Sequence, residues 1–440
     1  MPPPLADKLR RIAGAPHVLT GVECSPYVLE GRAPEAVVFP GSKEEVAAIL
    51  MLAAEAEVPV IPWGGGTRLG LGSPPARLGV VIGLRRLDRI LEHVPGDLTA
   101  TVEAGITLGA LQSALGTQGQ WLSLDPAYPE RATLGGILAS NASGPRRHLY
   151  GTCRDLLIGI TVVGADGAIV HGGGKVVKNV AGYDLPKLYI GSFGTLGIVV
   201  EATLKLRPRP DEDRLVIARF PRLAEGGAAA LAIMASDLIP SALDLVDAEA
   251  AGALGLGATG GALLIGVDGI REQVEWQCGE IARLLRPLGS EPEVVDGPPR
   301  DLIWRGLAEL GRAGMPDVAA IMKWGVLPTR LPELLETGAA VARRNGLRAV
   351  LAAHAGVGIA TAVLAGRGAD AAAAARTLEE WRGMVDGAGG YALLEWAPLG
   401  VKERVAVWDE PGPALRLMKA IKDRLDPRGI LNPGRFVGGI

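Results

Sequence analysis

The sequence predicts an α+β protein with more than one domain. Three observations predict this fold class. A β-α-β pattern at 36–63 ends in a glycine-rich loop, a hairpin and a long strand complete the region up to 210, and alternating strands and helices with antiparallel returns follow. The length of 440 residues is typical of two or three domains.

Composition and charge exclude several classes of function. Hydrophobic residues make up 48% and charged residues 21% of the chain, and the net charge of -3 provides no basic surface for nucleic acid. No apolar run is long enough to span a membrane, and the N-terminal residues do not form a secretory signal. We therefore expect a soluble globular protein with no transmembrane segment and no nucleic-acid partner.

Cysteine and histidine are too sparse for metal chemistry. Cys24, Cys153 and Cys278 lie far apart and form no CxxC pair, and the five histidines are scattered along the chain. The sequence thus predicts no iron–sulfur cluster, no structural zinc, no disulfide framework and no metal site. A reducing, cytoplasmic location is expected.

The first clear elements form a short β-α-β unit. Residues 36–39 predict a strand, Ser42 begins a helix, and Glu45 three residues later completes a capping box. A second strand is predicted at 58–61, directly before the glycines of VIPWGGGTRLGLG.

The region up to residue 210 alternates short elements with glycine-rich turns. Asp166-Gly167 predicts the turn of a hairpin, and a helix that begins near residue 133 is expected to break at 141–145. The predicted strands are 78–84, 97–105, 156–163, 168–171 and a long strand after 194, and the predicted helices are 107–118 and a short turn at 183–190.

After Pro210, strands and helices alternate regularly. Their order predicts a domain of the ferredoxin-like type, and no internal repeat of 20–50 residues is visible. The predicted strands are 214–220, 242–247, 262–269, 317–326, 347–357, 358–366 and 391–398, and the predicted helices are 221–235, 270–286, 329–345, 369–387 and an amphipathic helix after 411.

The glycine-rich loop indicates a bound phosphate. Gly64, Gly65 and Gly66 allow positive φ angles and a close approach to a ligand, and their N–H groups can form an anion-binding nest. The register excludes the G-x-G-x-x-G dinucleotide motif, and the Lys-Ser/Thr pair of a P-loop is missing. A plain tight turn is the alternative interpretation of this loop alone.

Two further segments of small residues favour a cofactor site. ATLGGILASNASG at 132–144 can pack flat against a planar ligand, and Gly194 and Gly197 precede a strand. Taken singly, these segments are explained by a closely packed helix and a strand-entry turn. Three such segments, each beside a strand, predict three walls of one cofactor site.

Four motifs carry a resemblance to a known family. They are PWGGGTRLG, ATLGGILASNASG, the segment from GGKVVKNVAGYD to VVEATLKL, and DPRGILNPGRF. In this order they resemble FAD-binding oxidoreductases of the vanillyl-alcohol-oxidase (PCMH-type) family, and most closely the accessory FAD-binding subunit of bacterial glycolate oxidase. The resemblance implies a two-subdomain PCMH-type FAD-binding domain at 1–210, an α+β ferredoxin-like cap or substrate domain at 211–410, and a segment at 411–440 that returns to the FAD-binding domain.

The resemblance also implies that the cofactor is FAD. A covalent flavin in this family needs a His or Cys in the cofactor loops, and 62–70 contains neither, so we expect non-covalent FAD. Residues 62–69 would hold the pyrophosphate, 194–198 would contact adenine or ribose, and Asn432 would lie near the isoalloxazine ring. The implied cofactor residues are Pro62, Trp63, Gly64, Gly65, Gly66, Thr67, Arg68, Leu69, Thr133, Leu134, Gly135, Gly136, Ser140, Asn141, Gly144, Gly194, Thr195, Gly197, Ile198 and Asn432.

His354 is the candidate catalytic residue. Active family members carry a HxGDGNxH-like segment, and this chain has HAGVGIATA, in which His354 and Gly356 match. Trp396 replaces a later histidine, Phe193 replaces a glutamate, and no acidic partner for His354 is evident nearby in sequence. A buried core histidine is the alternative interpretation of His354.

These departures favour an accessory role within the family. We expect the FAD-binding subunit of a glycolate oxidase-type complex that carries electrons from the oxidation of glycolate, D-lactate or a related 2-hydroxy acid. The expected partners are a catalytic FAD subunit and an iron–sulfur subunit, through which the chain could associate peripherally with a membrane. The alternatives are an autonomous FAD-dependent 2-hydroxy acid dehydrogenase and a structural subunit that has lost FAD, and the intact glycines argue against the latter.

Overall fold

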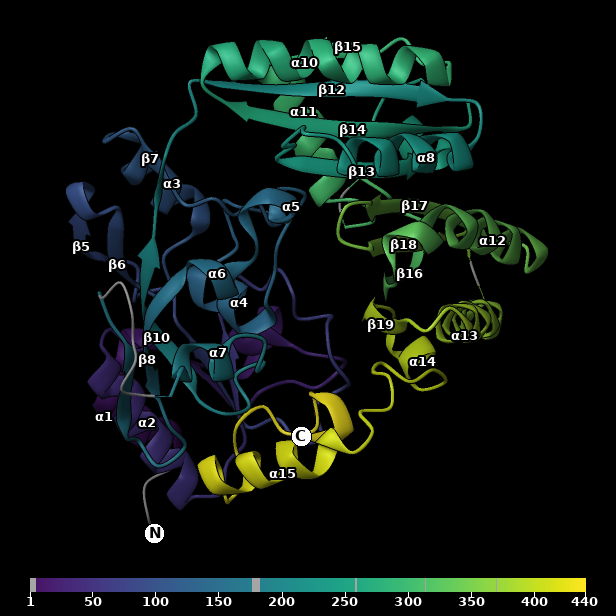
Figure 1. Cartoon of the computed structure of the whole chain (residues 1–440). Helices are drawn as coiled ribbons and strands as arrows, with labels where there is room; N and C mark the ends of the chain where they lie inside the picture. Colours follow the sequence, from purple (N-terminus) through teal and green to yellow (C-terminus); the bar gives the residue numbers. More distant parts are fainter. Residues whose placement is uncertain (1–4, 176–182, 258, 313, 369) are drawn as a thin grey trace. The chain divides into compact units, whose positions relative to one another are not determined.

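The chain forms two compact units, which Figure 1 draws with their elements labelled. The computed structural model describes residues 5–175, 183–257, 259–312, 314–368 and 370–440. The first unit contains the residues up to Ser143 together with Thr152–Arg209 and Glu410–Ile440. The second contains Gly144–Gly151 and Pro210–Asp409. A short segment, 144–151, therefore belongs to the second unit although its neighbours in sequence belong to the first.

A four-stranded sheet of the first unit carries the glycine-rich loop. Its order is β1-β2-β4-β3, with β2, β4 and β3 parallel and β1 antiparallel to β2. The predicted β-α-β unit is β2-α2-β3, and Ser42 caps α2 by accepting a hydrogen bond from the Glu45 backbone N–H. The elements are α1 (Leu5–Ala13), β1 (Val18–Thr20), β2 (Ala36–Val38), α2 (Lys43–Glu55), β3 (Val60–Trp63) and β4 (Val80–Gly83).

A five-stranded antiparallel sheet carries the other two small-residue segments. Its order is β5-β6-β10-β8-β9, and the predicted hairpin is β8-β9. The helix predicted from residue 133 is α4, which ends before Asn141 as expected. The elements are β5 (Ile90–Val94), β6 (Thr99–Glu103), α3 (Leu108–Gly116), α4 (Leu134–Ser140), α6 (Cys153–Leu156), β8 (Leu157–Val163), β9 (Ile169–Gly173), α7 (Leu185–Tyr189) and β10 (Ile198–Lys205), with β7 (Gln120–Trp121) and β11 (Arg207–Pro208) as a separate two-stranded ladder.

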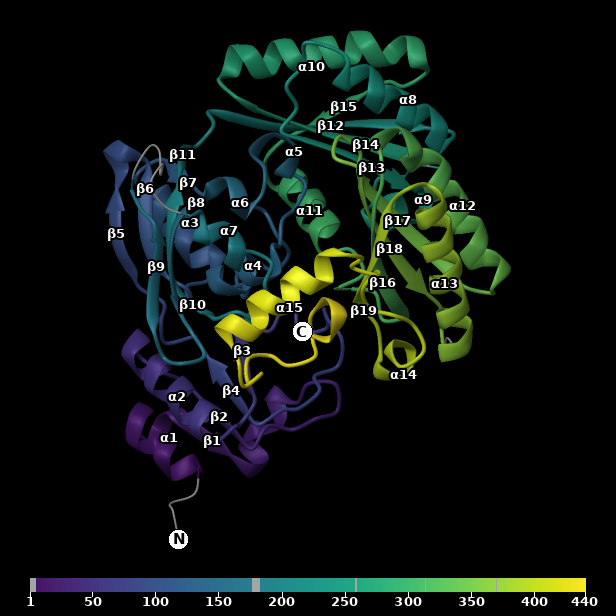
Figure 2. The same cartoon turned by 60° about the horizontal axis from the view of Figure 1, so that its bottom comes forward.

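The C-terminal residues complete the first unit. After α15 (Ala414–Leu425), which is yellow in Figure 2, Leu431 forms a parallel bridge with Val60 at the edge of β3. The Val60 N–H donates to the Ile430 carbonyl at 2.7 Å, and the Asn432 N–H donates to the Val60 carbonyl at 2.8 Å. Residues 430–432 therefore extend the sheet at the strand that leads into the glycines.

The second unit is one eight-stranded antiparallel sheet made of two ferredoxin-like motifs. The motifs are β12-α8-β13-β14-α10-β15 and β16-α12-β17-β18-α13-β19, and the sheet order is β15-β12-β14-β13-β17-β18-β16-β19. Pairing of β13 with β17 joins them. The elements are α5 (Arg147–Tyr150), β12 (Glu212–Phe220), α8 (Leu223–Met234), β13 (Ala242–Asp247), α9 (Ala248–Ala253), β14 (Gly261–Gly269), α10 (Arg271–Leu285), β15 (Glu293–Val295), α11 (Gly297–Ala308), β16 (Val318–Gly325), α12 (Leu331–Arg344), β17 (Arg348–His354), β18 (Ile359–Ala365), α13 (Ala371–Gly387), β19 (Tyr391–Trp396) and α14 (Leu399–Lys402).

The two faces of this sheet carry different side chains. Helices α8, α10, α12 and α13 cover one face over an apolar core that includes Trp324 and Trp381. Helices α9 and α11, which the sequence did not predict, pack on the other face. Because side chains alternate along a strand, His354 shares this second face with Val350 and Ala352.

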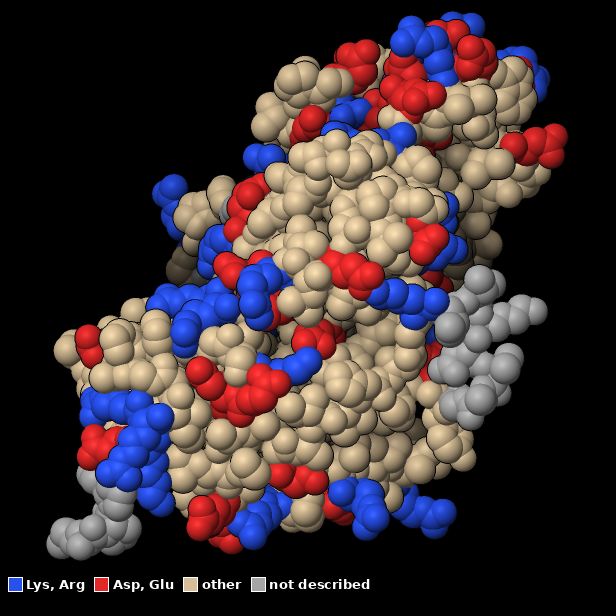
Figure 3. All heavy atoms as spheres, turned by 90° about the vertical axis from the view of Figure 1, so that its left-hand side faces the viewer, with Lys and Arg blue, Asp and Glu red and all other residues tan. Residues whose placement is uncertain are grey.

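The surface of the molecule carries both signs of charge. Figure 3 shows basic and acidic side chains interspersed over the face drawn there. Within the described ranges, no helix is both long and apolar enough to cross a lipid bilayer.

Candidate functional site

A pocket in the first unit brings the three glycine-rich segments together. It lies between the loop after β3, the helix α4, the turn before β10 and the C-terminal residues. Most of the residues predicted to bind the cofactor line it, although they are far apart in sequence. The lining residues are Ile61, Pro62, Trp63, Gly64, Gly65, Gly66, Thr67, Arg68, Leu69, Leu84, Thr133, Gly135, Gly136, Ala139, Ser140, Phe193, Gly194, Gly197, Ile198, Val199, Asn432 and Arg435.

Close packing explains two of the three consecutive glycines. A Cβ on Gly65 would lie 1.6 Å from the Arg131 carbonyl oxygen, and one on Gly64 would lie 2.1 Å from Thr133 Oγ1. Gly66 has a positive φ of 72°. The expectation of positive φ angles is therefore right for Gly66 and is corrected for Gly64 and Gly65, whose missing side chains let the loop rest directly on the segment before α4.

Helix α4 supplies the second wall of the pocket. Its N-cap is Thr133, whose Oγ1 accepts a hydrogen bond from the Gly136 N–H at 3.4 Å. A Cβ on Gly135 would lie 2.9 Å from the Ala104 Cβ, so the helix lies close to the end of β6. Ser140 Oγ donates to the Gly136 carbonyl at 2.6 Å. The residues of α4 that line the pocket have small side chains, which leave room for a bulky ligand.

The turn before β10 supplies the third wall. The Phe193 N–H donates to the Ala139 carbonyl at 2.9 Å, and Asn432 Nδ2 donates to the Phe193 carbonyl at 2.6 Å. Phe193 and Gly194 both have positive φ, 59° and 68°, and a Cβ on Gly194 would lie 2.9 Å from Pro62 Cγ. Because a bulky residue rarely adopts this backbone conformation, the turn holds strain at the pocket. The preceding part of the third motif, residues 176–182, lies outside the described residues.

Four predicted cofactor residues lie outside the pocket lining. Leu134 is fully buried in the core, and Thr195 Oγ1 donates to the Ser192 carbonyl at 2.7 Å. Asn141 is the left-handed C-cap of α4, and Gly144 belongs to the second unit. Core packing accounts for Leu134, and helix termination accounts for Asn141.

Arg435 is a pocket residue that the predicted cofactor set omitted. Its side chain is buried, and its Nη2 donates to the carbonyl oxygen of Leu69 at 2.7 Å and to that of Leu71. Burial lowers the pKa of Arg435 to about 10, and Glu30 opposes this effect, so the guanidinium is charged at pH 7. A positive charge therefore stands against the glycine-rich loop. The other lining residues that the prediction missed are apolar: Ile61, Leu84, Ala139, Phe193 and Val199.

Lys422 fastens the C-terminal residues to the turn before β10. Its buried Nζ donates to the Thr195 carbonyl at 2.8 Å, to the Leu431 carbonyl at 2.9 Å and to Asp426 at 2.6 Å. Burial lowers the pKa of Lys422, whereas the Asp426 carboxylate raises it. The buried ammonium donates to three acceptors, and these hydrogen bonds hold the C-terminal residues against the turn before β10.

In the second unit, His354 pairs with an acid that the sequence did not reveal. The antiparallel pairing of β13 and β17 puts Asp244 directly opposite His354. His354 Nδ1 lies 2.5 Å from Asp244 Oδ1, and the Asp244 side chain is 1% exposed while that of His354 is 19% exposed. The two residues are 110 positions apart, which explains why no partner was visible nearby in sequence.

His148 packs close to Gly356, two residues beyond His354. A Cβ on Gly356 would lie 2.1 Å from His148 Nδ1, so the glycine makes room for the imidazole. Burial lowers the pKa of His148, and the opposing effect of Asp244 is smaller, so His148 is neutral at pH 7. The glycine that matched the family pattern thus has a packing role in this chain.

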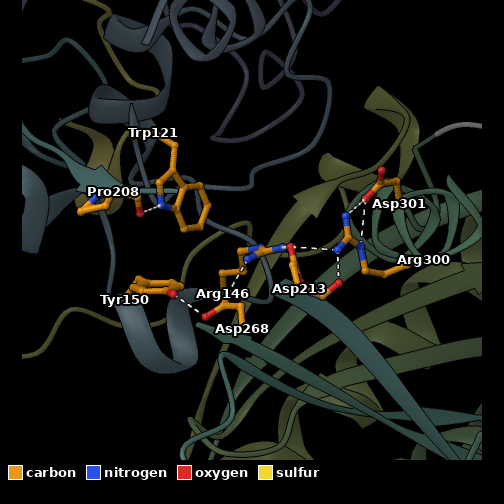
Figure 4. Close-up of polar contacts among 8 residues, drawn as sticks. All are labelled: Trp121, Arg146, Tyr150, Pro208, Asp213, Asp268, Arg300 and Asp301. Carbon is orange, nitrogen blue, oxygen red and sulfur yellow. Dashed lines mark hydrogen bonds and ion pairs between the residues drawn. The ribbon is translucent and has the colours of Figure 1, made fainter. Parts of the chain in front are cut away.

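An ion-pair network, drawn in Figure 4, holds the segment that carries His148. Arg146 donates to Asp268 at 2.7 Å and to Asp213 at 2.5 Å, and the Tyr150 hydroxyl donates to Asp268 at 2.5 Å. Burial raises the pKa of Asp268, whereas Tyr150 and Arg146 lower it. Because Arg146 and Tyr150 flank His148, their bonds to β12 and β14 fix its position.

Beside Trp396, the buried carboxylate of Glu395 forms ion pairs with two basic side chains. Glu395 is 3% exposed and pairs with Lys323 at 2.9 Å and with Arg312. In the part of the chain that the structure describes, no group of three His, Cys, Asp or Glu side chains is arranged to hold a metal ion.

Two protein-family models match most of this chain. The FAD binding domain matches residues 34–173, and the C-terminal domain of FAD linked oxidases matches residues 209–436. The chain belongs to the FAD-linked oxidase family. It is an FAD-dependent oxidoreductase, and the predicted family and cofactor are confirmed.

Relatives and solved structures agree with this assignment. The chain is 31% identical to the glycolate oxidase subunit GlcD of Bacillus subtilis (strain 168) over 92% of this chain and 89% of that protein. It is 29% identical to the D-lactate dehydrogenase of Archaeoglobus fulgidus over 94% of each chain. The structure of p-cresol methylhydroxylase with substrate bound matches with a TM-score of 0.78 and 19% identity over 98% of this chain and 96% of that one. An alkyldihydroxyacetonephosphate synthase structure matches with a TM-score of 0.78 and 20% identity over 99% and 86%. The predicted PCMH-type fold class is thereby confirmed.

Proposed function

We propose that this chain uses FAD to oxidise a small 2-hydroxy acid of the glycolate and D-lactate class. The relatives named glycolate oxidase subunit and D-lactate dehydrogenase support this substrate class. The observation that carries the proposal is the His354–Asp244 pair, because it supplies an oriented proton acceptor. Bound FAD supplies the acceptor for the hydride that leaves the substrate Cα. His354 takes the hydroxyl proton.

In this proposal the first unit holds FAD without a covalent bond. The described residues that line the pocket include no histidine and no cysteine. The loop at 64–69 would hold the pyrophosphate, and Arg435 would supply positive charge that favours a diphosphate there. Asn432 Nδ2 donates to the Phe193 carbonyl, so Asn432 and the turn at Gly194 would contact neighbouring parts of the cofactor.

We further propose that the chain works as one subunit of a complex. Electrons stored on FAD need an onward acceptor, and Cys24, Cys153 and Cys278 are separate, buried thiols in the described structure. An iron–sulfur subunit would take the electrons, and a second FAD subunit would belong to the same assembly. The cytoplasmic location, with membrane contact through partners, stays a prediction from the cysteine content.

An accessory role is the second candidate. In that case another FAD subunit oxidises the substrate and this chain relays electrons. Glu395 favours this role, because Lys323 and Arg312 occupy the carboxylate beside Trp396, where the family pattern has a histidine.

Anaerobic flavin reduction separates the two candidates. The FAD-loaded protein is mixed with glycolate or D-lactate without oxygen, and the visible flavin absorbance is followed. Bleaching by this chain alone, lost in His354→Gln, supports substrate oxidation on this chain. Bleaching that requires added partner subunits and is unaffected by His354→Gln supports the accessory role. The absence of bleaching by any 2-hydroxy acid, with and without partners, contradicts both.

A further inference from the structure

We propose that Asp244 is a positioning residue that sets the tautomer of His354 and thereby makes its Nε2 the proton acceptor. This inference rests on the proposed oxidation of a 2-hydroxy acid by this chain. It concerns contacts within the second unit alone, where β13 of one ferredoxin-like motif meets β17 of the other.

Strand register fixes the geometry of the pair. Asp244 stands opposite His354, and Leu245 stands opposite Ala353 in the same register. Residues directly opposite each other on antiparallel strands have Cβ atoms about 5 Å apart, so the two short side chains have little freedom when they meet. Nδ1 of His354 and Oδ1 of Asp244 lie 2.5 Å apart, within hydrogen-bonding distance.

The chemistry of the partner selects the tautomer. A carboxylate can only accept hydrogen bonds, so the hydrogen between the two side chains resides on Nδ1 of His354. Nε2 of the neutral ring then carries a lone pair and is the basic atom. A histidine without this partner is free to carry its hydrogen on Nε2, where it can no longer accept the substrate proton. Asp244 therefore acts through His354 and has no need to touch the substrate.

Neighbouring charges do not compete for the Asp244 carboxylate. His148 is neutral at pH 7, because burial lowers its pKa. Arg146 pairs with Asp213 and Asp268 on β12 and β14. The second oxygen, Asp244 Oδ2, is buried without a hydrogen-bond partner among the described residues. The carboxylate is thus available to stabilise charge on His354.

The proposed step balances in atoms and charge. Bound FAD would accept the hydride of the substrate Cα–H bond, and as the hydroxyl O–H bond breaks its proton would pass to His354 Nε2 while the carbonyl double bond forms. His354 becomes an imidazolium, and the Asp244 carboxylate offsets its charge. Since the His354 side chain is 19% exposed, the proton can then pass to water.

Nitrogen NMR tests the tautomer without any enzymatic turnover. Spectra of protein labelled with ¹⁵N-histidine are recorded at a pH high enough for the imidazoles to be neutral. The signals of His354 are assigned as those that are missing from the spectrum of His354→Gln. The wild type is expected to show hydrogen on Nδ1. Asp244→Asn is expected to shift His354 toward the Nε2–H form, because an amide can donate as well as accept. A wild-type spectrum with hydrogen on Nε2 overturns the proposal whether or not the variant folds.

Flavin reduction by the holoenzyme tests the consequence. Asp244→Asn is expected to slow reduction by the 2-hydroxy acid about 100-fold or more while FAD content and melting temperature stay at wild-type values. Asp244→Glu, which keeps a carboxylate, should recover part of the rate. The matched control is Asp247→Asn on the same strand, since Asp247 is also buried but caps α9 through the Ala250 N–H. A wild-type rate in folded Asp244→Asn contradicts the proposal.

The two measurements separate the inference from the function on which it rests. A wild-type protein that has the Nδ1–H tautomer but reduces FAD with no 2-hydroxy acid contradicts the proposed function and leaves the role of Asp244 in setting the tautomer intact. A protein that is active and whose rate and tautomer are both unchanged in Asp244→Asn contradicts the inference and leaves the function intact.

Discussion

The sharpest prediction concerns Gly65 in the pocket loop. In Gly65→Ala the added methyl would lie 1.6 Å from the Arg131 carbonyl oxygen, and real Cβ atoms essentially never come closer than 3.0 Å to another heavy atom. The loop must therefore move away from the segment before α4 by about 1.4 Å. Both neighbours of the new methyl belong to the backbone, so rotation of a side chain cannot relieve the contact.

The size of the effect follows from this displacement. Forcing an extra methyl into a packed site costs about 1 to 3 kcal/mol. If the loop regains its position only when FAD is bound, a cost of about 2 kcal/mol appears as an FAD dissociation constant raised about 30-fold. If the apo-protein already has the clash, the same cost appears instead as a lower melting temperature.

Titration of the apo-protein with FAD, followed by the quenching of flavin fluorescence, measures the first quantity, and a thermal melt measures the second. Gly96→Ala is the matched control, because a Cβ on Gly96 has no heavy atom within 4 Å and its φ is not positive. If Gly65→Ala has the same FAD affinity and melting temperature as Gly96→Ala, close packing does not require glycine at position 65 and the reasoning is refuted.

Three further predictions concern charges. Arg435→Met should raise the FAD dissociation constant about tenfold to a hundredfold by removing a buried cation that also holds the Leu69 carbonyl, and an unchanged constant in the same fluorescence titration argues against its place in the site. Arg146→Met should destabilise the second unit by about 3 kcal/mol in urea unfolding, because Asp268 and Asp213 lose their shared partner, and a loss under about 1 kcal/mol speaks against the network. Burial raises the pKa of Asp247 to about 6, so the folded state binds its proton more tightly than the unfolded state, and stability from this group is present below about pH 4 and lost as pH rises through 6. The free energy of unfolding of the wild type minus that of Asp247→Asn should therefore fall by up to about 3 kcal/mol between pH 4 and pH 7, and a flat difference would count against the assignment.

Local pattern was enough to predict many of the regular elements of the chain. The strand predicted at 242–247 coincides with β13, and the helix begun by Ser42 is α2, because apolar periodicity and a capping side chain are both encoded within a few residues. Helix α11 escaped prediction for a physical reason. It begins with Gly-Pro-Pro, which is typical of a turn, although Ile303 and Leu307 lie at helical spacing and pack on the sheet.

Long-range pairing set the limit of what the sequence could predict about the site. The glycine walls were predicted because each wall is a contiguous motif. Asp244 was missed because it reaches His354 through the joining of two ferredoxin-like motifs, and no local pattern encodes which edges of two motifs pair. The contact between Arg435 and Leu69, which spans 366 positions, was likewise not encoded by any local pattern.

The C-terminal completion of the first unit has a consequence for biosynthesis. Residues 430–432 lie along the edge of β3, and they leave the ribosome only after the whole of 210–409 has been translated. Until then the edge of β3 is an unpaired strand beside a glycine-rich loop that lacks its guanidinium, a state prone to pairing with other nascent chains. Asn432 and Arg435 are therefore the last lining residues to join the pocket, and the second unit has the opportunity to fold before the pocket is complete.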